Sequence, residues 1–171
     1  RILALPANDF VSDFIGSGST LKGLHFERVR NVELADFPVA SVSTPRDQAL
    51  ASLSASDEKW LLVLDEETRP VRWVNEAHLA RTDEPLTNLG APVVSKVEPQ
   101  ATLHDALEEM LSSNAGSAVV VDGKGRYQGV VAAETLTGAV AAMRADAKRH
   151  YEELAAEEKV AADLAAGEAR L

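Results

Sequence analysis

The sequence contains no cysteine, so it can form no disulfide and offers neither a thiol nucleophile nor a cysteine ligand for zinc. Basic residues are also scarce, with 17 Lys and Arg against 27 Asp and Glu and a net charge of −10. An acidic chain is a poor general binder of nucleic acid, because phosphates need clustered basic side chains. No apolar run approaches the roughly 20 residues that span a bilayer, and no signal peptide is visible. The absence of cysteine fits a reducing compartment, and an apolar content of 46% is typical of a globular domain.

The strongest pattern present is an internal repeat, in which the chain matches itself without a gap at a fixed offset. The identical pairs include Ala49 and Ala106, Val63 and Val120, Asp65 and Asp122, Arg69 and Arg126, and Leu79 and Leu136. A repeat of this length indicates one supersecondary unit that is used twice. We therefore expect two copies that bury their shared faces against each other, with a ligand cleft between them.

Each copy has the same order of expected elements, β-α-β-β-α, which predicts an α/β fold. The expected strands are residues 39–42, 61–64 and 71–74 in the first copy and 93–97, 118–121 and 128–132 in the second. Continuous apolar runs at 61–64 and 118–121 are typical of strands that are buried on both faces. Thr102 is a favourable N-cap with Asp105 as its capping partner. Second helices are expected near Glu76 and Glu134, and Thr135 is interpreted as an N-cap.

Both ends of the chain extend beyond the repeats. An apolar stripe at Phe10, Val11, Phe14 and Ile15 predicts a short helix that ends in the loop Gly16–Ser19. The last helix is expected to run from Glu134 to about Glu168, with a seam of Leu136, Val140, Met143, Ala147, Tyr151 and Leu154. This tail is interpreted either as a solvated helix or as a dimerisation or docking helix. The start at Arg1 without Met indicates a piece of a longer protein.

The second copy resembles a CBS motif, the module named after cystathionine β-synthase. The resemblance rests on Ala118–Asp122, the turn Gly123-Lys124-Gly125, the return strand to Val131, and Leu136. The first copy, from Trp60 to Val74, is a degenerate version of the same motif. The resemblance implies a tandem CBS pair, with a first motif at 37–82, a second at 92–140 and a helical tail at 141–171. CBS pairs commonly dimerise, so a homodimer is expected.

Residues 1–24, with Pro6-Ala7-Asn8-Asp9-Phe10, are similar to the end of an ABC transporter ATPase domain of the glycine betaine, carnitine or choline importers. This resemblance implies a regulatory module on the cytoplasmic side of the membrane, with the ATPase domain and the transmembrane permease as partners. Walker A and Walker B sequences are absent from the chain, so no ATP hydrolysis is expected of it.

The resemblance also implies a nucleotide site. The residues expected to form it are Val94, Ala118, Tyr127, Val131, Ala132 and Thr135 with Asn75 and His78. In the family, a Thr or Ser binds phosphate and an Asp three residues later binds ribose. Ala132 and Thr135 stand at these places in the second copy, and Asn75 and His78 in the first. The pattern therefore disfavours ordinary ATP or AMP binding and leaves cyclic di-AMP, at the interface of two pairs, as the favoured ligand.

Other interpretations remain open. Members of the family also respond to ionic strength, for which the basic residues Lys22, His25, Arg28 and Arg30 are candidates. The competing interpretation is that the pair binds no ligand and serves as a structural dimerisation module that uses the long helix. No two histidines have ligand spacing on one helix, so no metal site is expected. Trp60 and Trp73 are interpreted as packing residues, and no catalytic residue is assigned.

Overall fold

The structure is a computed structural model that describes residues 22–81 and 84–169. The helix predicted around Phe10–Ile15 and the loop Gly16–Ser19 lie outside these ranges. The chain divides into two units, Arg1–Leu136 and Thr137–Leu171. The first unit contains both repeats, and the second contains most of the last helix.

The first repeat forms a four-stranded sheet in the order β1-β2-β3-β4. Its elements are β1 (Val39–Ser41), α3 (Arg46–Ser54), β2 (Trp60–Leu64), β3 (Pro70–Asn75), α4 (Glu76–Arg81), the 3-10 helix η2 (Leu86–Asn88) and β4 (Ala91–Pro92). β1 runs parallel to β2, while β2, β3 and β4 are antiparallel neighbours. The β-α-β-β-α order predicted for this copy is confirmed.

The second repeat forms a three-stranded sheet in the order β5-β6-β7. Its elements are β5 (Lys96–Val97), α5 (Leu103–Leu111), β6 (Ala118–Val121), β7 (Tyr127–Val131) and the start of α6 (Ala133–Ala169). The predicted N-cap of α5 is confirmed, because the Thr102 hydroxyl accepts the Asp105 N–H at 3.1 Å and the Asp105 carboxylate accepts the Thr102 N–H at 3.2 Å.

Each sheet gains an edge partner from outside its own repeat pattern. β4 lies just ahead of the second repeat, yet it pairs with β3 of the first sheet. Ala35, which precedes the first repeat, exchanges two backbone hydrogen bonds of 2.8 and 3.0 Å with Val130 of β7. The strand predicted at 93–97 is confirmed only for Lys96–Val97: residues 93–95 connect β5 to Ala91–Pro92, which belongs to the other sheet.

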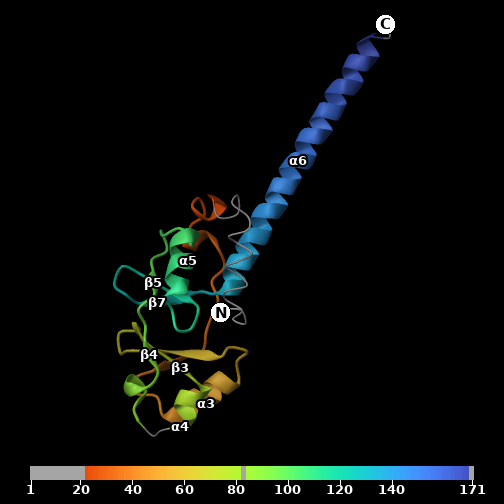
Figure 1. Cartoon of the computed structure of the whole chain (residues 1–171). Helices are drawn as coiled ribbons and strands as arrows, with labels where there is room; N and C mark the ends of the chain where they lie inside the picture. Colours follow the sequence, from red (N-terminus) through yellow and green to blue (C-terminus); the bar gives the residue numbers. More distant parts are fainter. Residues whose placement is uncertain (1–21, 82–83, 170–171) are drawn as a thin grey trace, which may run out of the picture. The chain divides into compact units, whose positions relative to one another are not determined.

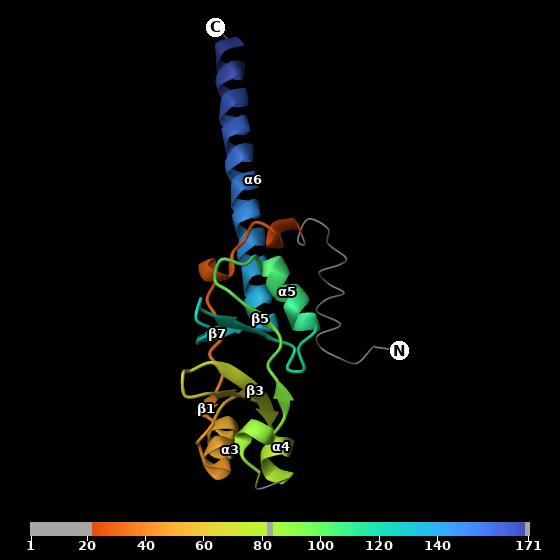
Figure 2. The ribbon, with the colours of Figure 1, turned by 90° about the vertical axis from the view of Figure 1, so that its left-hand side faces the viewer.

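The two sheets pack against each other between outer layers of helix. Figures 1 and 2 show α3 and α4 outside the first sheet and α5 outside the second. Because side chains alternate along β2, Leu61 and Val63 pack in the core between the first sheet and its helices α3 and α4, and Leu62 packs in the core between the two sheets. That second core also contains Phe37, Trp73, Val93, Val119, Val121, Val130 and Ala132. The prediction that these central strands are buried on both faces is confirmed.

The turns between the paired strands show that the two copies are built alike. In the first, one carboxylate oxygen of Asp65 accepts the N–H groups of Glu67 and Arg69, and the other accepts Arg69 Nε at 2.9 Å. In the second, Asp122 makes the same three bonds with Lys124 and Arg126, the last at 2.8 Å. The matched Asp and Arg pairs of the sequence therefore serve one turn geometry.

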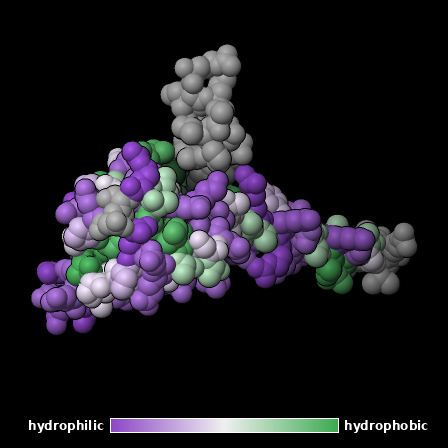
Figure 3. Space-filling model, turned by 90° about the horizontal axis from the view of Figure 1, so that it is seen from below, coloured by the Kyte–Doolittle hydropathy of each residue, from purple (hydrophilic) through white to green (hydrophobic). Residues whose placement is uncertain are grey.

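The second unit is the outer part of α6, which extends to Ala169 close to the predicted end. All side chains from Arg144 to Gly167 are exposed. The space-filling view shows apolar and polar residues side by side along this helix (Figure 3). In the part of the chain that the structure describes, no helix has the length and hydropathy needed to cross a bilayer.

Candidate functional site

Four of the predicted site residues lie at two equivalent helix starts, those of α4 and α6. α4 begins after Asn75, whose side-chain oxygen accepts the His78 N–H at 3.0 Å, while His78 Nδ1 accepts the Asn75 N–H at 3.1 Å. α6 begins after Ala132, and the Thr135 hydroxyl accepts the Ala132 N–H at 3.1 Å. The interpretation of Thr135 as an N-cap is therefore wrong. Ala132 occupies that place, and Thr135 reaches back to it from the third helical position.

These hydrogen bonds show what His78 and Thr135 do at the two positions where the nucleotide-binding pattern described above has an aspartate. His78 and Thr135 both satisfy a backbone N–H that a helix start would otherwise leave without a partner. Because Nδ1 of His78 accepts a hydrogen bond, the ring carries no proton on that nitrogen. Each of these side chains is thus already engaged in its own helix.

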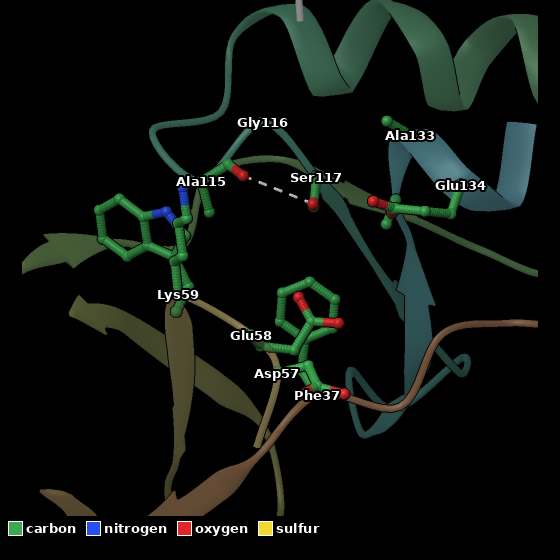
Figure 4. Close-up of a pocket in the computed structure, with 11 residues that line it drawn as sticks. Phe37, Asp57, Glu58, Lys59, Ala115, Gly116, Ser117, Ala133 and Glu134 are labelled. Carbon is green, nitrogen blue, oxygen red and sulfur yellow. Dashed lines mark hydrogen bonds between the residues drawn. The ribbon is translucent and has the colours of Figure 1, made fainter. Parts of the chain in front are cut away.

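A cavity of about 340 Å³ lies between the two repeats. The first repeat contributes Asp57, Glu58, Lys59 and Trp60, the second contributes Ala115, Gly116, Ser117, Ala132, Ala133 and Glu134, and Phe37 completes the wall. Residues 57–60 lead into β2 and residues 115–117 lead into β6, so the cavity lies where equivalent segments of the two copies face each other. Figure 4 shows the Glu58 carboxyl and the Ser117 hydroxyl on opposite walls.

The charges of this cavity are mostly negative. Three carboxylates, from Asp57, Glu58 and Glu134, line it with the single ammonium of Lys59. Burial raises the pKa of Glu58 above its ordinary value, and the carboxylates of Glu134 and Asp57 raise it further. Glu58 belongs to the first repeat and Glu134 to the second, so like charges oppose each other across the boundary between the copies.

The apolar parts of the wall and one buried hydroxyl give the cavity its other chemistry. Phe37 is buried against Trp73, with ring centroids 5.6 Å apart in an edge-on arrangement. Ser117 is 4% exposed, and its hydroxyl donates a long hydrogen bond of 3.5 Å to the Ala115 carbonyl. The cavity therefore offers an aromatic and aliphatic surface next to carboxylates, which suits an uncharged or cationic group better than a phosphate at neutral pH.

A second cavity, of about 550 Å³, lies wholly in the first repeat. Its lining residues are Leu53, Ser54, Ser56, Glu58, Lys59, Asn75, Glu76 and Ala77. Glu58 and Lys59 line both cavities, so the segment before β2 separates them. A movement of this segment would change the shape of both spaces.

The structure distributes the predicted site residues over several places. Ala132 lines the cavity between the repeats and Asn75 lines the second one. Ala118 and Val131 are fully buried, and Tyr127 is half-buried with its pKa raised by burial. Val94, at 68% exposure, lies on the surface between β4 and β5. Neither of the two cavities described above is lined by all eight residues.

Of the residues that line this cavity, sequence reasoning proposed only Ala132 as a site residue; those missed include Phe37, Asp57, Glu58, Ser117 and Glu134. Most of them precede a strand and follow no periodic pattern. The repeat itself carried a signal, because its fixed offset places Lys59 on Gly116 and Trp60 on Ser117. Equivalent segments that precede buried strands in a paired fold are expected to meet across the shared face.

One group of described side chains outside the cavity has the spacing of metal ligands. It consists of His104, Asp105 and Glu108, whose ligand atoms lie within 4.8 Å of one another. Asp105 already caps α5, and the His104 ring stacks on His25 with centroids 3.9 Å apart. These side chains therefore have partners within the protein.

Comparison with known proteins identifies the kind of domain that this chain carries. The CBS domain family model matches residues 90–142. The CBS-pair protein CBSX2 of Arabidopsis thaliana has the same fold, with a TM-score of 0.62 and 20% identity over 69% of this chain and 96% of that one. The chain therefore carries a CBS domain, and its two repeats have the fold of a CBS pair.

One curated protein is similar in sequence, and a further solved structure is similar in fold. The osmoprotectant import ATP-binding protein OsmV of Salmonella typhimurium is 26% identical over 132 residues, which are 77% of this chain and 35% of OsmV. Staphylococcus aureus OpuCA shares the fold, with a TM-score of 0.54 and 14% identity over 63% of this chain and 94% of that one. The chain is thus a CBS module related to osmoprotectant ABC importer ATPase subunits, and it spans about a third of the length of OsmV.

Proposed function

We propose that this chain is the regulatory module of an osmoprotectant importer's ATP-binding subunit, and that it senses a signal in the cavity between its repeats. The observation that carries the proposal is that both repeats line this cavity. A signal that favours one spacing of the walls shifts the two repeats relative to each other, and differential affinity for two arrangements is what regulation requires. The similarity to OsmV supports the assignment to an importer.

The proposed partners follow from the same relationship. We expect the module to act with an ATPase domain and a transmembrane permease, as a homodimer at the cytoplasmic face of the membrane. It contributes regulation and no reaction of its own. ATP hydrolysis and solute transport belong to other parts of such a transporter.

Adenine nucleotides, with cyclic di-AMP first, are the ligands to test. CBSX2 has been solved in complex with AMP, and the apolar wall with Phe37, Trp60 and Ala132 provides a surface for a base. The carboxylates of Glu58 and Glu134 oppose phosphate. A nucleotide that enters this cavity should therefore bind more tightly to Glu134→Gln than to the parent chain.

Calorimetric titration of the chain with cyclic di-AMP, ATP, ADP and AMP tests the proposal. Glu66→Gln is the matched control, because it removes the same charge at an exposed turn position. Tighter binding by Glu134→Gln, and not by Glu66→Gln, places a nucleotide in the cavity. Binding that neither variant alters places it elsewhere, such as between two modules. The absence of heat with all four ligands argues against a nucleotide signal.

Ionic strength is the second candidate signal, because Glu58 and Glu134 repel each other from different repeats. The Debye screening length is about 8 Å at physiological ionic strength and shortens as salt is added, so added salt weakens this repulsion. Added salt should therefore favour the arrangement in which Glu58 and Glu134 lie close to each other across the cavity. We expect the Tm of the parent chain to rise with NaCl more steeply than that of Glu58→Gln. Equal slopes would argue against this mechanism.

The alternative is a module that binds no ligand and only holds two ATPase subunits together. Truncation after Met143 discriminates in part. Loss of self-association with retention of the folded repeats, in a protein whose full chain responds to neither nucleotide nor salt, would support the structural alternative. Nucleotide or salt sensitivity of the full chain would support the regulatory proposal, whether or not truncation abolishes self-association.

A further inference from the structure

One face of the outer part of α6 has a regular pattern and no partner among the described residues. Steps of three and four residues connect Arg144, Ala147, Tyr151, Leu154, Glu158, Ala161 and Ala165, which we call the tail face. All seven side chains are exposed, with Tyr151 at 76% and Leu154 at 42%. Isolated helices are marginal in water, and most helical stability in proteins comes from packing of such a face. A partner for the tail face is therefore expected.

The two charged members of the tail face are placed symmetrically around Tyr151. Arg144 lies two helical turns before Tyr151, and Glu158 lies two turns after it. With a rise of 1.5 Å per residue, each is about 10 Å from Tyr151 along the axis. An antiparallel copy centred on Tyr151 would bring Arg144 of each chain to the height of Glu158 of the other.

We propose that the tail faces of two copies of this chain pair antiparallel, with the twofold axis near Tyr151. Charge complementarity selects this orientation. The stretch around Arg144, Lys148 and Arg149 is mainly basic, and residues 152–163 are mainly acidic. An antiparallel pair sets basic against acidic stretches at both ends. A parallel pair sets Arg144 beside Arg144 and Glu158 beside Glu158, which is repulsive.

The apolar members of the tail face fit a close helix pair. Ala147, Ala161 and Ala165 allow the two backbones to approach, and Tyr151 and Leu154 gain cover from the partner helix. Val160 and Leu164 lie on the opposite side of the helix, roughly half a turn from Tyr151. The inference does not depend on which signal the cavity takes.

Cross-linking of single-cysteine variants tests the orientation, and the absence of native cysteine makes the result unambiguous. In the antiparallel pair, position 151 meets itself, whereas positions 165 lie about 40 Å apart. We expect Tyr151→Cys of the full chain to form a disulfide dimer under mild oxidation, and Ala165→Cys and the opposite-face control Val160→Cys to remain uncross-linked. Efficient self-cross-linking of Ala165→Cys would show parallel pairing and overturn the proposal.

Charge reversal tests the same pairing without cysteine. Glu158→Lys should raise the Kd of self-association about tenfold, because two exposed ion pairs per dimer become repulsive. Asp163→Lys makes the same change in net charge off the tail face and should have little effect. The double variant Arg144→Glu/Glu158→Lys should restore association, as measured by sedimentation equilibrium.

Two outcomes of the sedimentation experiment would overturn the proposal. One is a chain that stays monomeric at all accessible concentrations. The other is equal weakening by Glu158→Lys and Asp163→Lys, which would indicate a general effect of charge. Nucleotide titration reads the cavity independently, so failure of tail pairing and failure of the regulatory function are distinguishable.

Discussion

Replacement of Gly90 by alanine should destabilise the fold more than the same change at Gly116 or Gly125, which have a similar positive φ. Gly90 has φ +68° and lies just before β4, where the chain passes close to β3. A Cβ at this position would lie 1.9 Å from the Trp73 carbonyl oxygen and 3.0 Å from Val74 Cγ1. Because the oxygen belongs to the backbone, no rotamer change relieves the contact.

Gly116 provides the matched control, with φ +67° and no atom within 4 Å of the position of a Cβ. Alanine at either site carries the cost of a left-handed conformation, about 1–2 kcal/mol. At Gly90 the backbone must also move, which separates β4 from β3. The Val93 N–H bond to the Val71 carbonyl, 3.1 Å long, is the first at risk and is worth about 1 kcal/mol. We expect a total of about 2–3 kcal/mol for Gly90→Ala.

Urea denaturation of the two variants, followed by circular dichroism, measures the difference in the free energy of unfolding. Gly90→Ala should lose at least about 1 kcal/mol more than Gly116→Ala, the value of one ladder hydrogen bond. Equal losses within about 0.5 kcal/mol would refute the reasoning. They would mean that backbone strain alone, and not the close approach of β4 to Trp73, sets the requirement for glycine.

Three further expectations concern caps and carboxylates. Thr102→Ala should cost about 1 kcal/mol in urea denaturation through loss of the α5 capping box, and Thr102→Ser should retain most of it. Hydrogen bonds from the Arg126 and Lys124 N–H groups and from the Arg126 guanidinium lower the pKa of Asp122. Burial raises the pKa of Asp65, but the equivalent hydrogen bonds from Arg69 and Glu67 outweigh it and lower that pKa as well. Their ionised forms therefore stabilise the fold above about pH 4, and this is lost as the pH falls through the folded-state pKa. The double variant Asp65→Asn/Asp122→Asn should lose less of its stability between about pH 5 and pH 2; an unchanged acid transition would contradict this. The raised pKa of Glu58 has the opposite sign, because its stability contribution is present at low pH and lost as the pH rises. Glu58→Gln should thus raise the Tm at pH 7 but not at about pH 4, while Glu66→Gln leaves it unchanged; a gain that persists at pH 4 would point to packing instead.

Local chemistry allowed much of the fold to be predicted from the sequence. The apolar runs at 61–64 and 118–121 could be interpreted as central strands because no residue in them suits solvent. The Asp65 and Asp122 turns follow from side chains that bond their own backbone two and four residues on. Thr102 and Asp105 form a cap whose partners are three residues apart. In each case the deciding interaction lies within a few residues.

The parts that could not be predicted depend on contacts between distant segments. The stretch Ala91–Val97 mixes three strand-forming valines with Pro92, Ser95 and Lys96, and only the assembled fold divides it between two sheets. The N-cap of α6 was assigned to Thr135 and not to Ala132, because Ala132 has no polar side chain to mark it. The cavity walls at Asp57–Lys59 and Ala115–Ser117 face each other only after both sheets have packed.

The exchange of edge segments has a consequence for fragments of this protein. Ala35 covers the β7 edge of the second sheet, and β4 covers the β3 edge of the first. A single repeat cut at the limits of its sequence pattern would expose one of these edges, and an unpaired edge is a template for aggregation. Neither half is then a self-sufficient folding unit. A one-repeat form of this module would need a second molecule to cover its edge, so internal duplication replaces what would otherwise be an association between chains.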